Sequence, residues 1–327
     1  MTKRSIIKAK IESAILNKKS EQCSVLENQE SMLARYVKEG VSEALSEIRD
    51  KFENTEDTQN CLSYHNTKHT KDVIRRVETL TFTLNQTTTK LVTEQEINIA
   101  ILAAAFHDVI QQWDVKHIIT SNGIFQGFTK IMRERHSPDI EFASANKAVF
   151  FMEKINHKNT LPLFSDNDKF LISEAIKITI PKFDTAKGFI TQPYLTTKTP
   201  LIARIVALAD LGTAGMDGPE AFLSEVDALF REENIDISNV SKDLDNLTND
   251  QKDYYRNRII DWLKRELAFA EGRRNNLSDE LNGAPDEAKQ KISKLFTTFD
   301  ESIHGIKTMI DRRTVKPFEK LLIEMGY

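Results

Sequence analysis

Five residues in three distant stretches of the chain carry the side chains that a metal site needs. His65 and His69 stand four residues apart, so a helix would place both imidazoles on one face. His107 and Asp108 directly follow one apolar run, and Asp210 directly follows another. Polar side chains at the ends of buried segments need partners, because an unpaired buried polar group is costly. A shared divalent cation would satisfy all three segments.

The expected ligands are His69, His107, Asp108 and Asp210, which would supply two nitrogens and two carboxylate oxygens. This set suits Mn, Fe, Zn, Ni or Mg, with water in the remaining positions. Each residue has an ordinary alternative: His107 could be a hydrogen-bonded core histidine, and Asp210 could cap a helix before Gly212. Four such residues at the ends of apolar segments favour a metal site over these alternatives.

The order of these residues resembles the H…HD…D signature of the HD superfamily of metal-dependent phosphohydrolases. Residues 64–73, Tyr-His-Asn-x-x-His-x-x-x-Val, are similar to the first metal motif of cyclic-nucleotide phosphodiesterases, a relative within that superfamily. Residues 141–145 and 209–212 resemble two elements of small bacterial HD phosphohydrolases. The resemblance covers about residues 45–235. It implies an all-α domain that cleaves a phosphoester with a metal-activated water.

Three residues are candidates for the catalytic steps. In the phosphodiesterase motif the first histidine donates a proton to the leaving oxygen, so the resemblance gives this role to His65; an imidazole can serve as acid or base at physiological pH. Asp108 could orient the attacking water, as could Asp210, and Glu141 could hydrogen-bond that water or a ligating histidine. The alternatives are a core histidine for His65 and an exposed first-turn glutamate for Glu141.

Binding of a phosphate requires cations or amide donors, and three basic residues are candidates. Lys68 lies between the two histidines, Arg204 lies on the segment that ends in Asp210, and Lys182 lies in an expected loop. Each could instead be an ordinary solvated charge. The chain has no Walker loop and no Rossmann fingerprint, which disfavours classical ATP or NAD binding. We expect the partner to be a small phosphorylated substrate such as a nucleotide.

Two other functions stay open at this point. A binuclear site, as in HD-type di-iron oxygenases, would need two more histidines; His117, His136 and His157 lie in the right interval, but none lies in a recognisable motif. One ion is therefore expected rather than two. Alternatively, the metal could be structural in a non-catalytic regulatory module, with the C-terminal third as a partner surface.

Composition narrows the class of protein. The 327 residues are 40% hydrophobic and 29% charged, as is usual for globular proteins, and 11 Gly with 8 Pro favour helices over a turn-rich β fold. The net charge of −4 argues against dedicated nucleic-acid binding or a membrane-surface role. Cys23 and Cys61 provide no disulfide framework. Without a signal peptide or an apolar run of membrane length, we expect a cytoplasmic protein.

The pattern of apolar residues predicts an HD helical bundle with additional helices at both ends. We expect an N-terminal helical extension over residues 1–44, the HD core over residues 45–235 and a C-terminal helical region packed on it over residues 236–327. Thr93 and Glu96 predict a capping box at the start of one core helix. Nothing alternates with period two, so no sheet is expected. The charged C-terminal helices could also form a homodimer.

Overall fold

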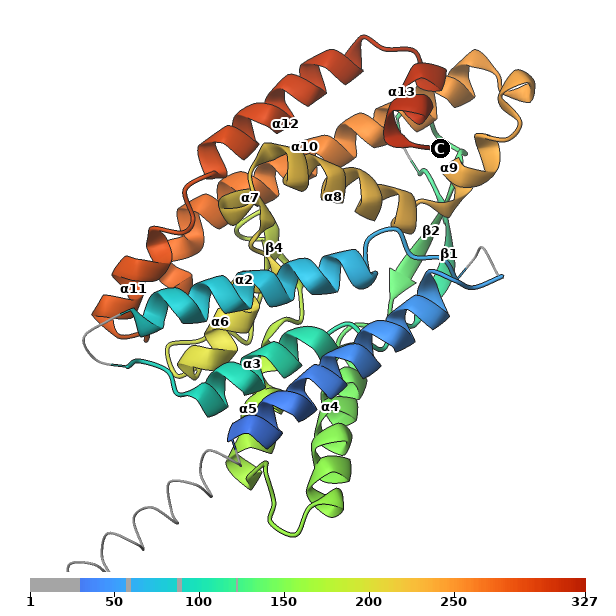
Figure 1. The fold of residues 1–327 in the computed structure, drawn as a ribbon. Coiled ribbons are helices and arrows are strands. Elements are labelled where there is room, and N and C mark those ends of the chain that lie inside the picture. The colour runs from blue at the N-terminus through green and yellow to red at the C-terminus, as the bar shows by residue number, and fades with distance from the viewer. Residues whose placement is uncertain (1–29, 57–59, 87–89, 122) are drawn as a thin grey trace, which may run out of the picture.

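The computed structural model describes residues 30–56, 60–86, 90–121 and 123–327, and helices dominate them (Figure 1). The prediction of an all-α fold is confirmed. After a helix over residues 30–52, the elements are α2 (Thr67–Asn85), α3 (Glu94–Phe106), β1 (Trp113–Ile119), β2 (Thr129–Arg135), α4 (Asp139–Lys158), α5 (Asp166–Ile178), β3 (Lys182–Asp184), β4 (Phe189–Thr191), α6 (Leu201–Asp210), α7 (Thr213–Met216), α8 (Pro219–Glu233), α9 (Ile235–Val240), α10 (Asn249–Glu280), α11 (Asp286–Ser293), α12 (Phe299–Thr314) and α13 (Phe318–Met325).

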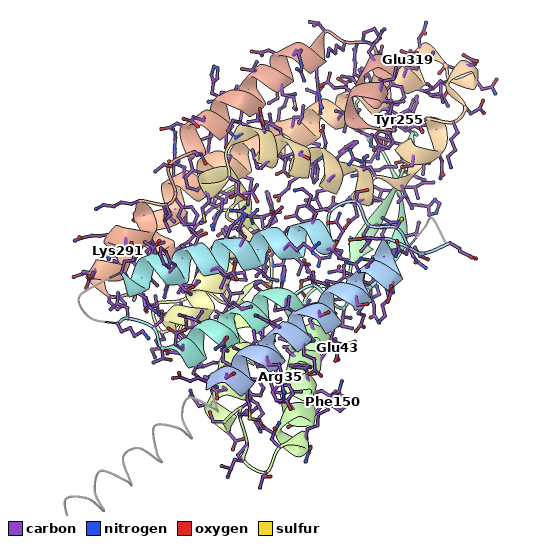
Figure 2. The ribbon with its side chains drawn as sticks, viewed as in Figure 1. Arg35, Glu43, Phe150, Tyr255, Lys291 and Glu319 are labelled. Carbon is purple, nitrogen blue, oxygen red and sulfur yellow. The ribbon has the colours of Figure 1, made fainter. Side chains whose placement is uncertain are left out.

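The helix over residues 30–52 packs tightly against the core bundle. A side chain at Gly40 would meet Leu102 and Phe151 at 2.7–2.8 Å, so only glycine allows this close approach to α3 and α4. Glu43 accepts a hydrogen bond of 2.9 Å from Lys154 on α4 (Figure 2). Residues 1–29 of the expected N-terminal helical extension lie outside the described residues.

Helices α2 to α6 form the core that positions the candidate site. Helix α3 packs on α2, α4, α5 and α6, and its C-terminal half, residues 99–106, is almost entirely buried. Three consecutive alanines, Ala103 to Ala105, let neighbouring backbones approach it closely. Nearly every side chain of α6 is also buried. The two helices that end in candidate ligands therefore lie in the middle of the bundle.

The C-terminal helices cover one side of this core. Helices α10 and α12 pack on each other and on α8, and α11 contacts α2 (Figure 1). Helix α10 continues to Glu280 before the chain turns. In the described part of the chain, no helix, α10 included, is both long and apolar enough to cross a membrane.

Two short antiparallel hairpins, β1–β2 and β3–β4, contradict the expectation that no sheet forms. A two-stranded ribbon does not bury one full face, so it needs no strict alternation of polar and apolar residues. Strand β2 packs on α8 and α9. The larger hairpin brings Arg135, at the end of β2, close to the site.

Candidate metal centre

The first turn of α2 presents His69. The side chain of Asn66 caps the helix by accepting hydrogen bonds from the backbone N–H groups of Lys68 (2.9 Å) and His69 (3.1 Å). Val73 and Val77 continue the same face and are fully buried, as their spacing predicts. The face leads inward, so the imidazole of His69 is only 3% exposed.

The C-terminus of α3 explains how two adjacent residues can reach one point. If the helix continued through residues 107 and 108, their side chains would diverge by about 100°. The observed helix ends at Phe106, and His107 and Asp108 lie in the turn that follows. Nδ1 of His107 lies 2.8 Å from the carbonyl oxygen of Ala104 and donates to it, so Nε2 is the nitrogen available to ligate a metal. That Nε2 lies 3.1 Å from Oδ2 of Asp108.

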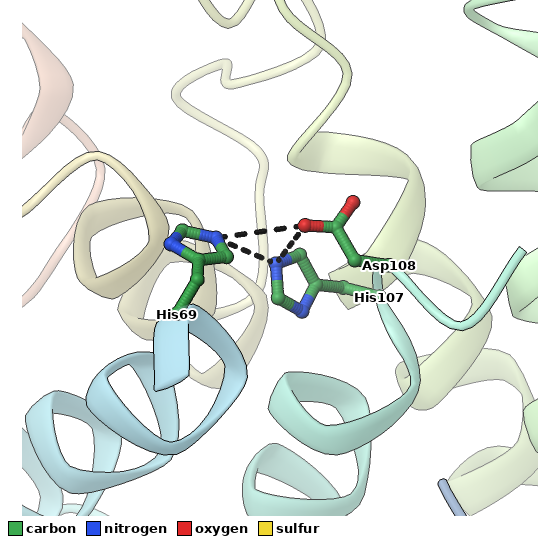
Figure 3. Close-up of side chains that lie close together, drawn as sticks. All are labelled: His69, His107 and Asp108. Atoms are coloured by element: carbon green, nitrogen blue, oxygen red, sulfur yellow. Dashed lines mark hydrogen bonds and ion pairs between the residues drawn. The ribbon is translucent and has the colours of Figure 1, made fainter. Parts of the chain in front are cut away.

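Four side chains converge on one point from three segments. Nε2 of His69 lies 3.4 Å from Nε2 of His107, 3.5 Å from Oδ2 of Asp108 and 3.4 Å from Oδ1 of Asp210. Figure 3 shows the first three of these side chains pointing toward one another. Donor atoms bound to a divalent ion at about 2.1 Å stand about 3.0 Å apart in an octahedron and about 3.4 Å apart in a tetrahedron. The spacing and chemistry of His69, His107 and Asp108, whose donor atoms all lie within 4.8 Å of one another, therefore fit a divalent cation, and Asp210 contacts both imidazoles beside them.

The electrostatics of the cluster favour ionised carboxylates. Burial raises the pKa of Asp108, but His107, His65 and Arg135 outweigh it and hold that pKa well below its usual range. Burial also opposes ionisation of Asp210, and the imidazoles of His107 and His69 lower its pKa in the same way. Both carboxyl groups are thus charged at neutral pH, which is the state that binds a cation.

His65 is held beside this cluster by a carboxylate that the sequence did not indicate. Oε2 of Glu232, near the end of α8, accepts hydrogen bonds from the backbone N–H groups of Tyr64 (2.7 Å) and His65 (3.1 Å), and Oε1 contacts Nδ1 of His65. Burial raises the pKa of Glu232, but His65 and these two N–H groups bring it below its ordinary value. An ionised Glu232 fixes the proton of His65 on Nδ1 and leaves Nε2 to act in the cavity that both histidines line.

A second carboxylate–cation arrangement, around Arg76, fixes the end of α6. Arg76 is fully buried seven residues after His69 on α2, and its Nη1 donates to the carbonyl oxygen of Ala209 at 2.8 Å. Its Nε donates to Asp217 at 2.8 Å and its Nη2 to Thr213 at 2.6 Å. The guanidinium thus connects α2, which carries His69, with the end of α6, which carries Asp210. The sequence feature that could have indicated this role is the position of Arg76 on the apolar face of α2, next to Val77.

Arg76→Met should lower the free energy of unfolding by about 3–5 kcal/mol, because Asp217 would lose its buried partner. It should also weaken metal binding, since the end of α6 loses its anchor. Denaturant unfolding with and without added metal would measure both effects. Arg75→Met is the matched control: Arg75 also binds Asp217 but is half exposed, so its loss should cost about 1 kcal/mol or less. Equal stability of the two variants would contradict this role.

The converging side chains line a cavity of about 160 Å³. Six of the nine predicted site residues line it, and these are His65, His69, His107, Asp108, Glu141 and Asp210. Glu141 is 3% exposed, so it is no solvated first-turn residue; Ser137 donates to its Oε2 at 2.9 Å. Burial raises its pKa more than Arg135 and Ser137 lower it.

The three predicted phosphate-binding residues do not line the cavity, and the structure shows why. The side chain of Lys68 is 68% exposed and pairs with Asp72 one turn further along α2. Arg204 is buried, and it donates to the backbone carbonyl oxygens of Glu280 and Thr196 instead. Lys182 is exposed on β3. None of these positions supports the predicted role.

Arg135 is the one basic side chain among the described residues that line the cavity, apart from histidines. It ends β2, and its Nη2 lies 3.3 Å from Oδ1 of Asp108 while its Nε donates to Gln111 at 3.0 Å. No local pattern in the sequence marks Arg135, because the strand that carries it shows no clear alternation of buried and exposed residues. The guanidinium holds the carboxylate oxygen that faces away from the histidines.

The histidines that a binuclear site would need lie elsewhere. His136 pairs with Asp114 at 3.2 Å, His157 is exposed in the last turn of α4, and His117 is exposed on β1. None of the three is among the described residues that line the cavity. The structure therefore does not bring together the extra ligands on which the di-iron alternative depends.

Comparison with known proteins identifies no relative. No family model matches the chain, and no curated protein or solved structure matches it either. The resemblance to the HD superfamily therefore depends on the ordered sequence motif alone.

Proposed function

We propose that the protein is an HD-type metal-dependent phosphohydrolase that cleaves a phosphoester of a small compound. One observation carries the proposal: the imidazoles of His69 and His107 lie 3.4 Å apart, and each lies 3.1–3.5 Å from a carboxylate oxygen of Asp108 and of Asp210. The imidazole of His65, oriented by Glu232, lines the same cavity. A purely structural metal site would not need an oriented acid–base group beside it.

The candidate metal ligands, His65, Glu232 and Glu141 would each have a separate role in the hydrolysis. A divalent ion held by the four ligands would polarise a phosphoryl oxygen and lower the pKa of water. In the proposed reaction the oxygen of a water would bond to phosphorus, its proton passing to solvent, while the bond from phosphorus to the alcohol oxygen breaks. His65 Nε2 would give its proton to the leaving oxygen, and Glu232 would stabilise the imidazolium before that transfer. Glu141, which lines the same cavity, would accept a hydrogen bond from the attacking water.

Arg135 is the phosphate-binding residue in this proposal, because it is the cationic side chain next to Asp108 in the cavity. Arg135→Gln should raise KM and lower kcat/KM about 10–100-fold through loss of a charge-assisted contact. Steady-state kinetics with metal content measured in parallel would separate this effect from loss of the ion. Lys116→Gln, on the exposed side of the same hairpin, should change neither parameter. An unchanged KM in Arg135→Gln would show that Arg135 does not bind the phosphate.

Metal identification on protein purified without chelators, paired with a phosphoester and nucleotide screen, tests the function. We expect one divalent ion per chain, and turnover that chelation abolishes and metal restores. Two irons per chain with oxygen consumption would instead indicate an oxygenase. A fully occupied site without turnover across the panel would indicate a regulatory module.

A further inference from the structure

The cavity extends from the metal ligands to a wall formed by α8 and α10. Glu233 ends α8 and Glu266 lies on α10, and both line the cavity together with Leu229, Phe269 and Ile190. Its volume of about 160 Å³ is close to that of an engineered cavity of about 150 Å³ that encloses one benzene molecule. The enclosed space therefore suits a small molecule, or one moiety of a larger one.

The side chains of Glu233 and Glu266 are partly buried. Neither carboxylate forms a hydrogen bond or an ion pair with any residue in the described ranges. Burial and the neighbouring Glu233 raise the pKa of Glu266 to about 8. Burial and Glu232 raise the pKa of Glu233 to about 7, although Lys130, Arg135 and Arg265 oppose this. Two such carboxylates are unfavourable when both are charged, unless a cation lies between them.

Glu141 lines the same cavity but already has partners. Ser137 donates to its Oε2 at 2.9 Å, and Nη2 of Arg135 forms an ion pair with its Oε1 at 3.9 Å. The carboxylates of Glu233 and Glu266 lack such partners in the described ranges, so they are the acidic groups of this cavity that a bound cation would neutralise.

A second metal ion fits this wall poorly. The described residues contain one group of three or more histidines, cysteines or acids close enough to bind an ion, and it is the group at His69, His107 and Asp108. Two carboxylates among Leu229, Ile190 and Phe269 offer too few ligands for a metal. They do match an organic cation, whose charge needs carboxylates and whose alkyl groups need apolar contacts.

We propose that the substrate is a phosphoester of an alcohol bearing an ammonium group, with Glu233 and Glu266 binding the ammonium and Leu229 and Phe269 contacting its alkyl part. This inference rests on the proposed phosphohydrolase function, which places the phosphate at the metal centre. It narrows the substrate class from small phosphates in general to zwitterionic ones.

The test compares phosphocholine with 3,3-dimethylbutyl phosphate, an ester of the same shape in which carbon replaces the charged nitrogen. The metal-loaded protein should hydrolyse phosphocholine with a kcat/KM at least about tenfold higher. Glu233→Gln/Glu266→Gln should bring this ratio close to one. Glu220→Gln, exposed at the start of α8, should keep it. A wild-type ratio near one, or a ratio that survives the double variant, would overturn the inference while the phosphohydrolase function stands.

A binding measurement keeps the inference testable if neither ester is hydrolysed. Titration of the metal-loaded protein with choline chloride, followed by calorimetry, should show saturable binding that 3,3-dimethylbutanol does not reproduce. The double variant should weaken that binding at least about tenfold. Choline binding without hydrolysis of any ester would contradict the proposed reaction but support the cation site. Absence of choline binding together with equal hydrolysis of the two esters would contradict the cation site and support the phosphohydrolase function.

Discussion

Asp108→Ala should remove the bound ion and lower phosphoester turnover at least about a thousandfold, since the ligand contributes charge as well as geometry. Asp108 is the best position for this test because it contacts both imidazoles and also holds Arg135. The helices should remain folded, because Asp108 lies in the turn after α3 rather than in the hydrophobic core. Metal content, kcat/KM and a thermal melt would be measured on the same preparation.

Asp72→Ala provides the matched control for Asp108→Ala. Asp72 lies on the metal helix α2 but is turned outward and pairs with Lys68, so the variant should keep both metal and turnover. Retention of a full equivalent of metal together with normal turnover by Asp108→Ala would contradict the proposed centre. Loss of turnover together with loss of helical signal would call for Asp108→Asn, which keeps the size of the side chain.

The sequence predicted the parts of the site that local pattern controls. The ends of α2 and α3 are set by capping: Asn66 caps one, and Thr93 with Glu96 forms the expected capping box on the other. Histidines and aspartates at the ends of apolar runs then had to face inward, because their neighbours are buried. The grouping of His69, His107 and Asp108, which could hold a metal ion, was therefore predictable from the periodicity and order of the residues, without knowledge of how the helices cross.

The rest of the site depends on tertiary contacts that no local pattern records. Glu232 lies 167 residues after His65, and only the packing of α8 brings the two together. Arg135 reaches the cavity through a hairpin whose strands have no clear alternation. Arg204 was predicted to bind phosphate because it lies on the helix that ends in Asp210. In the structure it instead donates to the backbone carbonyl oxygen of Glu280 at the end of α10. Position on the right segment does not determine which way a long side chain points.

The C-terminal region has a more direct role than packing alone. Glu266 and Phe269 of α10 line the cavity beside residues of α8, although the sequence suggested a boundary near residue 235. The cavity is thus shared between the predicted core and the predicted C-terminal region. The charged sequence of α10 carried no pattern that indicated this position beside the cavity.

His65→Asn should lower kcat about 10²–10⁴-fold while the protein keeps its metal, because a general acid contributes about that much. The effect should depend on the leaving group. Alkyl phosphoesters need protonation of a basic leaving oxygen, whereas a nitrophenyl ester releases a stable phenolate, so the variant should retain far more activity on the latter. Comparison of the two ester types in wild type and variant separates proton donation from a general disturbance of the site.

Glu232→Gln should have a smaller effect in the same direction, about 10–100-fold in kcat, since it orients His65 rather than contacting substrate. Because the two residues act as a unit, the double variant should be little worse than His65→Asn alone. Asp227→Asn, on the same helix but paired with Arg313, controls for loss of a buried carboxylate that does not contact His65. Equal losses on alkyl and nitrophenyl esters, or additive effects of the two changes, would remove His65 from the role of proton donor.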